Sequence, residues 1–302
     1  MQKADFTVRQ TEKQIRDTEE LKKELRNDEV VMKLFRTSGI PEKYLEISPW
    51  KIDDWRKQYA PCVGCQGLSR CGQNKEGYYQ ALVYDGLLQN VLMPCVYMRQ
   101  KLQKEKHLEN YLVSDLPKPL KTVSFKQILA DNESKEYLKV LQEAIEASHH
   151  SEGLYLYGTL GSGKTYLAAC ACNEHASRGE KVAFIHYPAF TQRMASLLRT
   201  DEYRTELKRL MYADFIVIDD IGAESCTEFN RDTILMTLLN HRYEEGLATW
   251  FTSNCDLASL QQHFTFASKN REDVLKAERI IERIRHMCKV AALTGRDRRM
   301  PL

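Results

Sequence analysis

The chemistry of this chain centres on the glycine-rich octapeptide GTLGSGKT at residues 158–165. It matches the phosphate-loop pattern G-x-x-x-x-G-K-[ST] at every fixed position. The glycines allow a tight curl whose N–H groups form an anion cradle with the start of a following helix. We expect Lys164 to contact the β- and γ-phosphates and Thr165 to ligate Mg²⁺. The predicted contacts to ATP or ADP are Gly158, Thr159, Leu160, Gly161, Ser162, Gly163, Lys164, Thr165 and Tyr166.

An acidic pair in FIVIDDIG supplies the other catalytic groups. Asp219 is expected to hold Mg²⁺, directly or through water, and Asp220 to orient and deprotonate the attacking water. Asp220 alone also fits a helix N-cap after a strand, and the two roles are compatible. Because Asp is one methylene shorter than the Glu that many such ATPases use, we expect slow or partner-dependent hydrolysis. Asn254, at the end of FTSN, fits either a turn residue or a hydrogen-bond donor to the γ-phosphate or the attacking water.

Four cysteines form a second chemical group, Cys62, Cys65, Cys71 and Cys95, with the spacing C-x₂-C-x₅-C-x₂₃-C. The N-terminus does not read as a signal peptide, and no apolar run reaches about 18 residues, so we expect a cytoplasmic protein without a membrane span. Thiols stay reduced in that compartment, which argues against disulfides. No βαβ context for a redox motif lies nearby. A closed, structural zinc site fits best.

The elements that must position these residues follow two patterns. Apolar runs at 152–158, 181–187, 213–220, 248–254 and 288–293 read as buried strands and alternate with helical segments. This order predicts an α/β fold with a parallel five-stranded sheet. Residues 9–35 and 96–112 read as helices, and SDLPKPLKT at 114–122 reads as a linker. We therefore expect a mainly helical zinc-binding domain at 1–112, a linker at 113–121 and an ATPase domain at 122–302.

The composition sets few limits on function. The chain has 302 residues and a net charge of +2, with 43% hydrophobic and 28% charged residues. These values are typical of a soluble protein with about two domains. The small net charge does not by itself point to nucleic acid or to a membrane surface.

These motifs together resemble the bacterial helicase-loader family of AAA+ ATPases, the family of the DnaI and DnaC loaders and of the transposition ATPase IstB. The segments that carry the resemblance are GLYLYGTLGSGKTYLA, FIVIDDIGAE, TSN and ERIIERI. They span about residues 150 to 300. The phosphate loop is shared by many NTPases, whereas DDIG and ERIIERI are narrower. The cysteine-containing domain in front of the ATPase resembles the DnaI branch.

The resemblance implies roles for further residues. It places an arginine finger at Arg283 and a second nucleotide sensor at Arg299. The other arginines near the C-terminus, Arg279, Arg285, Arg296 and Arg298, fit an ordinary solvated surface. A histidine can serve as a zinc ligand in this family. Because no histidine lies between Cys62 and Cys95, four thiolates are expected, with His107 as a weaker substitute for one of them.

The implied function is that of an ATP-dependent helicase loader in DNA replication. The expected partners are a DnaB-type helicase hexamer, single-stranded DNA and further primosome proteins, with oligomerisation on the helicase. ATP or ADP, Mg²⁺ and Zn²⁺ are the expected cofactors. The basic residues that could face DNA, or simply be solvated, are Arg193, Arg199, Arg204, Lys208 and Arg209. Two alternatives remain: an IstB-like transposition ATPase, and a zinc-stabilised adaptor that uses ATP binding as a switch with little turnover.

Overall fold

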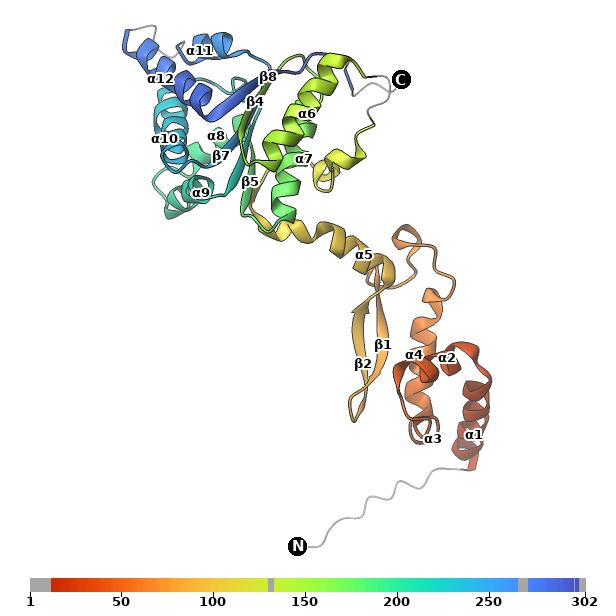
Figure 1. The fold of residues 1–302 in the computed structure, drawn as a ribbon. Helices are drawn as coiled ribbons and strands as arrows, with labels where there is room; N and C mark the ends of the chain where they lie inside the picture. The colour runs from red at the N-terminus through yellow and green to blue at the C-terminus, as the bar shows by residue number, and fades with distance from the viewer. Residues whose placement is uncertain (1–11, 130–132, 266–270, 296, 299–302) are drawn as a thin grey trace, which may run out of the picture. The chain divides into compact units, whose positions relative to one another are not determined.

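Figure 1 shows the fold in a computed structural model, which describes residues 12–129, 133–265, 271–295, 297 and 298. The chain forms two compact units, Met1–Gln103 and Lys104–Leu302. Within the described residues, no helix is long and apolar enough to cross a membrane.

The first unit packs short helices around a β-hairpin. Its elements are α1 (Glu12–Asn27), α2 (Glu29–Ser38), α3 (Tyr44–Ile47), α4 (Pro49–Tyr59), the 3₁₀ turns Ala60–Cys62 and Leu68–Arg70, β1 (Tyr78–Tyr84), β2 (Leu88–Pro94) and most of α5 (Val96–Glu105). The single helix expected at 9–35 is interrupted at Asp28, whose carboxylate caps α2 by accepting from the N–H groups of Val30 and Val31. The core of this unit includes the fully buried Leu25 and Ile52.

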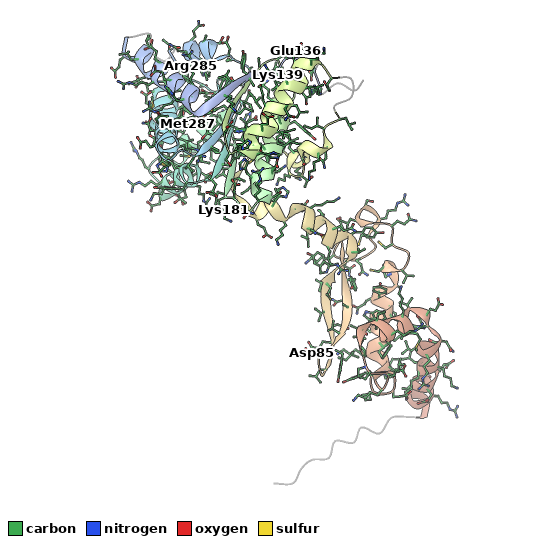
Figure 2. All side chains as sticks on the ribbon, in the orientation of Figure 1. Asp85, Glu136, Lys139, Lys181, Arg285 and Met287 are labelled. Atoms are coloured by element: carbon green, nitrogen blue, oxygen red, sulfur yellow. The ribbon has the colours of Figure 1, made fainter. Side chains whose placement is uncertain are left out.

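The antiparallel hairpin of β1 and β2 is absent from the sequence-based prediction. Its signal is the pair Asp85–Gly86 between two apolar segments, a strong local indication of a hairpin. Gly86 has a φ of 101°, which favours glycine, and Asp85 marks the hairpin tip in Figure 2. Both strands lie between Cys71 and Cys95, in the segment that the cysteine spacing assigns to a metal-binding loop.

The second unit contains a parallel sheet with the strand order β3-β5-β6-β7-β4-β8. Its strands are β3 (Tyr111–Ser114), β4 (Gly153–Tyr157), β5 (Val182–His186), β6 (Phe215–Asp219), β7 (Ala248–Ser253) and β8 (Cys288–Ala292). The five predicted strands are confirmed as β4 to β8. The predicted strand number is wrong, because β3 adds a sixth strand at one edge beside β5.

Helices cover both faces of this sheet, so its central strands are almost wholly buried (Figure 1). One face packs against α6 (Lys135–His149) and α7 (Lys164–Ser177). The other face packs against α8 (Tyr187–Ser196), α9 (Asp201–Met211), the π-helix Phe229–Leu235, α10 (Met236–Glu244), α11 (Leu257–Thr265) and α12 (Arg271–Met287). Short 3₁₀ turns at Lys106–Asn110, Lys118–Leu120 and Phe125–Gln127 complete the unit.

The domain boundary predicted at residue 112 is wrong, because the compact units divide between Gln103 and Lys104. The segment 113–121, predicted as a linker, instead belongs to the second unit. Leu116 is 5% exposed and packs in its core. The amide of Asn173 donates to the carbonyl oxygens of Leu120 and Val123. The prolines in this segment therefore shape a packed surface turn and do not separate two domains.

Candidate nucleotide-binding site

The phosphate loop joins the end of β4 to the first residue of α7, Lys164. This strand–loop–helix arrangement is the context that the motif requires. Gly158 has a φ of 147°, and a Cβ there would lie 2.1 Å from the carbonyl oxygen of Leu293. Gly163 has a φ of 102° immediately before the helix. The loop therefore requires glycine at both positions for the backbone conformation, and at Gly158 also because a side chain would clash with Leu293.

Lys164 lies across the loop, with its side chain largely buried. Its Nζ donates to the carbonyl oxygens of Gly158 at 3.0 Å and Thr159 at 2.8 Å. It also donates to Oδ1 of Asn254 at 3.0 Å. These oxygens hold the ammonium at the mouth of the loop, where phosphate oxygens can replace them as acceptors.

The predicted magnesium ligands meet at the carboxyl end of the sheet. The Thr165 hydroxyl donates to Oδ1 of Asp219 at 2.9 Å, and the Thr252 hydroxyl donates to the same oxygen at 2.6 Å. Burial raises the pKa of Asp219 above its usual value, although the two hydroxyl groups oppose this shift. A carboxylate and a hydroxyl are the hard oxygen ligands that Mg²⁺ uses, so these residues fit the ion implied by the motif.

Asp220 lies next to this pair in a left-handed conformation, with a φ of 62°. Its N–H donates to the Thr252 hydroxyl at 2.9 Å, and its Oδ1 accepts from the Asn254 amide at 3.1 Å. It lies in a turn and caps no helix, so the alternative N-cap role is not observed. A carboxylate held in this position can orient a water molecule beside the loop.

His186 is a site residue that sequence reasoning missed. It ends β5 and pairs in register with Asp219 of β6. Its Nε2 lies 3.8 Å from Oδ2 of Asp220, and the side chain is about half exposed. The sequence carries a signal for His186, because it is a polar residue at the end of the predicted strand that precedes FIVIDD. The carboxyl ends of neighbouring parallel strands meet at one edge of the sheet, so such a residue can reach the acidic pair.

Comparison with known proteins shows which family the chain belongs to. Residues 73–301 match the family model described as IstB-like ATP binding protein. The chain belongs to this family. The replicative helicase loader DnaI of Bacillus subtilis strain 168 is 27% identical over 290 residues, which cover 94% of this chain and 93% of the relative. The replicative helicase loader DnaC of Escherichia coli K12 is 26% identical over 130 residues, which cover 42% of this chain and 48% of DnaC.

Solved structures support the fold of the second unit. A crystal structure of DnaI is 28% identical and has a TM-score of 0.54, covering 64% of this chain and 99% of that structure. A primosome component from Streptococcus pyogenes, itself described as putative, is 25% identical with a TM-score of 0.51, covering 63% of this chain and 95% of that structure. Membership of the family of IstB-like ATP binding proteins thus agrees with the phosphate loop and with the parallel sheet.

The roles assigned to Arg283 and Arg299 from the family resemblance both stay predictions. Arg283 lies on α12, where its guanidinium carbon is 5.9 Å from the ring centre of Tyr243 on α10. Its Nε is buried and has no hydrogen-bond partner among the described residues. Arg299 lies outside the described residues, so its role as a sensor stays a prediction. The structure leaves the arginine-finger prediction for Arg283 untested, because such a finger acts on a neighbouring subunit.

The four cysteines of the first unit line one cavity of about 340 Å³. Two of them accept from backbone N–H groups: Cys71 from Gly77 at 3.3 Å and Cys95 from Met98 at 3.5 Å. Among the described residues, however, no three or more His, Cys, Asp or Glu side chains have the arrangement of a metal site. His107 lies in the second unit, where its Nε2 is 2.7 Å from the carbonyl oxygen of Lys121.

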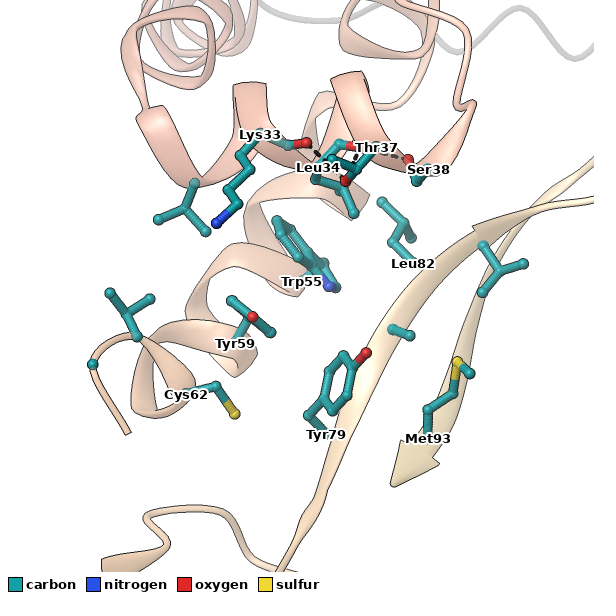
Figure 3. Close-up of a pocket in the computed structure, with 15 residues that line it drawn as sticks. Lys33, Leu34, Thr37, Ser38, Trp55, Tyr59, Cys62, Tyr79, Leu82 and Met93 are labelled. Atoms are coloured by element: carbon teal, nitrogen blue, oxygen red, sulfur yellow. Dashed lines mark hydrogen bonds between the residues drawn. The ribbon is translucent and has the colours of Figure 1, made fainter. Parts of the chain in front are cut away.

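The first unit also has an apolar groove of about 630 Å³ between α2, α4 and the hairpin. Figure 3 shows Trp55 and Tyr59 of α4 opposite Tyr79 and Met93 of the hairpin strands. The other residues that line the groove are Val30, Lys33, Leu34, Thr37, Ser38, Cys62, Val63, Gly64, Ala81, Leu82 and Val83. Lys33 is the charged residue among them.

The basic residues proposed to face DNA divide into two groups. Arg193 pairs with Asp115 at 3.2 Å and with Glu206 at 3.6 Å, so its charge is partly neutralised within the unit. Arg209 also pairs with Glu206, at 3.4 Å. The exposed members of the set are Arg199, Arg204, Lys208 and Arg209. Only exposed basic groups can contact phosphates without rearrangement, so Arg193 is the weakest of the five candidates.

Proposed function

We propose that this chain is an ATP-dependent loader that binds a DnaB-type replicative helicase and helps to place it on single-stranded DNA. The observation that carries the proposal is the extent of the match to DnaI, which includes 94% of this chain and 93% of that loader. An ATPase domain alone would fit other members of the family. The match extends through the cysteine-containing first unit, which precedes the ATPase fold. A role in DNA replication would place the chain in the cytoplasm.

The ATPase unit would bind ATP with Mg²⁺ and hydrolyse it slowly. Lys164 and the N–H groups of the loop would hold the phosphates, and Thr165 with Asp219 would hold the magnesium ion, which neutralises charge on the transferred phosphoryl group. Asp220 would orient the attacking water. Its side chain is already held by Asn254, so the γ-phosphate and the general base compete for one amide. Turnover would then depend on a partner that rearranges these contacts.

The first unit would contact the helicase and would be stabilised by zinc. The four cysteines share one cavity, and N–H groups donate to two of their sulfur atoms, as suits thiolates. Small movements of the loops 60–73 and 94–96 would be needed to form the cage. Four thiolates give a closed tetrahedral site, which stabilises a small domain and leaves no open position for catalysis.

The apolar groove of the first unit is the surface that we assign to the helicase contact. Interfaces are apolar at their centre and depleted of charged residues there, and this groove has Lys33 as its charged lining residue. An amphipathic helicase segment with an acidic residue next to its apolar face would match it.

The exposed Arg199, Arg204 and Lys208 of the second unit would contact DNA. Oligomerisation on the helicase would bring Arg283 to a neighbouring phosphate site.

Native mass spectrometry of the chain mixed with the replicative helicase of its own organism tests this division of labour. We expect zinc and helicase on the wild-type chain. Lys164→Ala should lose ATP but keep zinc and helicase, whereas Cys71→Ser should lose zinc and weaken the helicase complex. A Lys164→Ala chain that loses all helicase contact would contradict the assignment of helicase binding to the first unit. A Cys71→Ser chain with full zinc content would show that Cys71 is not a ligand.

A further inference from the structure

The segment that follows β8 turns back onto the phosphate loop and is fixed there at two points. The N–H of Leu293 donates to the carbonyl oxygen of Tyr157 at 2.7 Å, just before the loop begins. The N–H of Arg298 donates to the carbonyl oxygen of Gly161 at 2.9 Å, in the middle of the loop. The sequence predicts an ordinary solvated position for Arg298, whereas its backbone contacts the phosphate loop.

The Arg298 side chain adds a third contact to the loop. Its Nε donates to the carbonyl oxygen of Ser162 at 3.0 Å. Its two terminal nitrogens donate to both carboxylate oxygens of Glu133, at 2.5 and 2.7 Å. The guanidinium carbon lies 3.7 Å from the ring centre of the buried Tyr137 on α6. Bidentate pairing and stacking together fix the orientation of the guanidinium.

These contacts determine how two peptide groups of the loop are oriented. In a planar trans peptide, the C=O of one residue points opposite to the N–H of the next. The carbonyl groups of Gly161 and Ser162 both point toward Arg298. The N–H groups of Ser162 and Gly163 must therefore point away from Arg298, toward the inner side of the loop. The Ser162 N–H is 3.4 Å from the carbonyl oxygen of Thr159, across the loop interior. Inward N–H groups of this kind form the cradle for a phosphate.

We propose that Arg298, held by Glu133, is a positioning residue that pre-orients the phosphate loop for the β-phosphate of a nucleoside diphosphate or triphosphate. The proposal rests on the proposed function only in requiring that the chain binds ATP. Arg298 does not contact the nucleotide in this role. It acts through Gly161 and Ser162, whose peptide groups would otherwise sample other orientations before binding. Pre-orientation lowers the ordering cost of binding, so its loss weakens affinity without removing any direct phosphate contact.

The test compares nucleotide affinity and loop protection in five variants of the full chain. Binding of fluorescent ADP and of AMP is measured by titration, and hydrogen exchange by mass spectrometry over peptides that include residues 158–165. Arg298→Ala should bind ADP about tenfold more weakly, as expected for the loss of one to two net hydrogen bonds. Its AMP affinity should change much less, since AMP has no β-phosphate. Exchange at the loop should become faster in the nucleotide-free protein.

The other variants separate positioning from general stability. Glu133→Gln should weaken ADP binding less than Arg298→Ala, and the double variant should match Arg298→Ala, because both changes disrupt one unit. Arg298→Lys should not restore affinity, since an ammonium cannot pair with Glu133 in a fork and also donate to Ser162. Lys139→Ala removes an exposed charge from the same helix as Tyr137 (Figure 2) and should leave affinity unchanged.

Two results would overturn the inference. One is an Arg298→Ala chain that binds ADP as tightly as wild type with unchanged exchange at the loop. The other is equal weakening of ADP and AMP binding together with a lowered Tm, which would indicate a structural role. If Arg298→Ala does not fold, Glu133→Gln and Arg298→Lys decide by the same criteria. A wild-type chain that binds no nucleotide would instead contradict the proposed ATPase function, with Lys164→Ala as the negative reference.

Discussion

At the scale of single residues, the phosphate loop and the acidic pair are connected through one amide. Asn254 accepts from Lys164 through Oδ1 and donates to Asp220 through Nδ2. A bound γ-phosphate would compete for the lysine, and an attacking water would compete for the carboxylate. Binding of ATP would therefore change the hydrogen bonds of the Asp220 carboxylate without any movement of the sheet. The role of Asn254 as a γ-phosphate sensor stays a prediction, and these two hydrogen bonds are compatible with it.

Substitution of Asp219 by Asn should lower the rate of ATP hydrolysis and raise the stability of the nucleotide-free fold. Folding raises its pKa, so the ionised carboxylate costs stability at every pH above the folded-state pKa. That cost declines as the pH falls through the folded-state pKa and is gone below the usual value. Asp219→Asn removes it and can still accept from Thr165 and Thr252. We expect a higher Tm for the nucleotide-free variant at pH 7 and a loss of Mg²⁺-dependent turnover of about 10²-fold or more.

Thermal unfolding and turnover of Asp219→Asn are compared with those of Asp214→Asn, a carboxylate at the opposite end of the same strand. Asp214 accepts from the N–H of Lys181, so its substitution changes a local contact far from the loop. The interpretation would be contradicted if Asp219→Asn lowered the Tm or kept full turnover.

Sequence spacing predicts which side chains of the phosphate loop and of the strand ends lie close together. Lys164, Thr165, Asp219, Asp220 and Asn254 are brought together, because a phosphate loop and neighbouring strand ends have a fixed geometry. His186 and Arg298 could not be assigned from spacing. Their roles depend on strand order and on a chain reversal after β8, and both arise from tertiary contacts between segments far apart in the sequence.

At the scale of elements, the sequence predicts β4 to β8 and misses β3 and the hairpin of β1 and β2. The central strands are continuous apolar runs, which signal burial on two faces. β3 is four residues long and precedes a proline-containing turn, so its composition resembles a linker. The hairpin of β1 and β2 is half exposed and lies between cysteines. Short or half-exposed strands carry weak periodicity, and only pairing with a neighbour defines them.

The groove of the first unit gives a prediction at this scale. Val83, on β1, is 37% exposed and lines the groove. Val83→Asp should leave the fold intact, because the side chain already contacts water. It should weaken helicase binding by about tenfold or more, since it places a negative charge in the apolar lining of the groove assigned to the helicase. The affinity is measured by titrating the helicase with labelled chain.

A matched control exists in the second unit. Leu138, on α6, is also 37% exposed, so Leu138→Asp makes the same kind of change away from the groove. Equal helicase affinity for Val83→Asp and wild type would contradict the assignment of the groove. Equal weakening by both variants would point to a nonspecific effect of added charge.

At the scale of the whole molecule, two compact units carry two different kinds of chemistry. The second unit brings Thr165 of the phosphate loop and Asp219 together at the carboxyl edge of a six-stranded sheet. The first unit has four cysteines that line one cavity and, beside α2 and α4, an apolar groove. This separation fits a protein in which nucleotide state regulates a partner held elsewhere on the chain. Sequence composition predicted two units but placed their boundary nine residues too late.

The central claim is that the chain places a helicase on DNA, and loading onto a closed circle of single-stranded DNA tests it most directly. A closed circle has no end over which a ring can thread. The DNA-bound helicase is quantified after gel filtration, with ATP and with wild-type chain, Lys164→Ala chain or no chain. The account predicts several-fold more helicase on the circle with the wild-type chain than without it, and a loss of this gain with Lys164→Ala. The same amount of bound helicase in all three samples would contradict it.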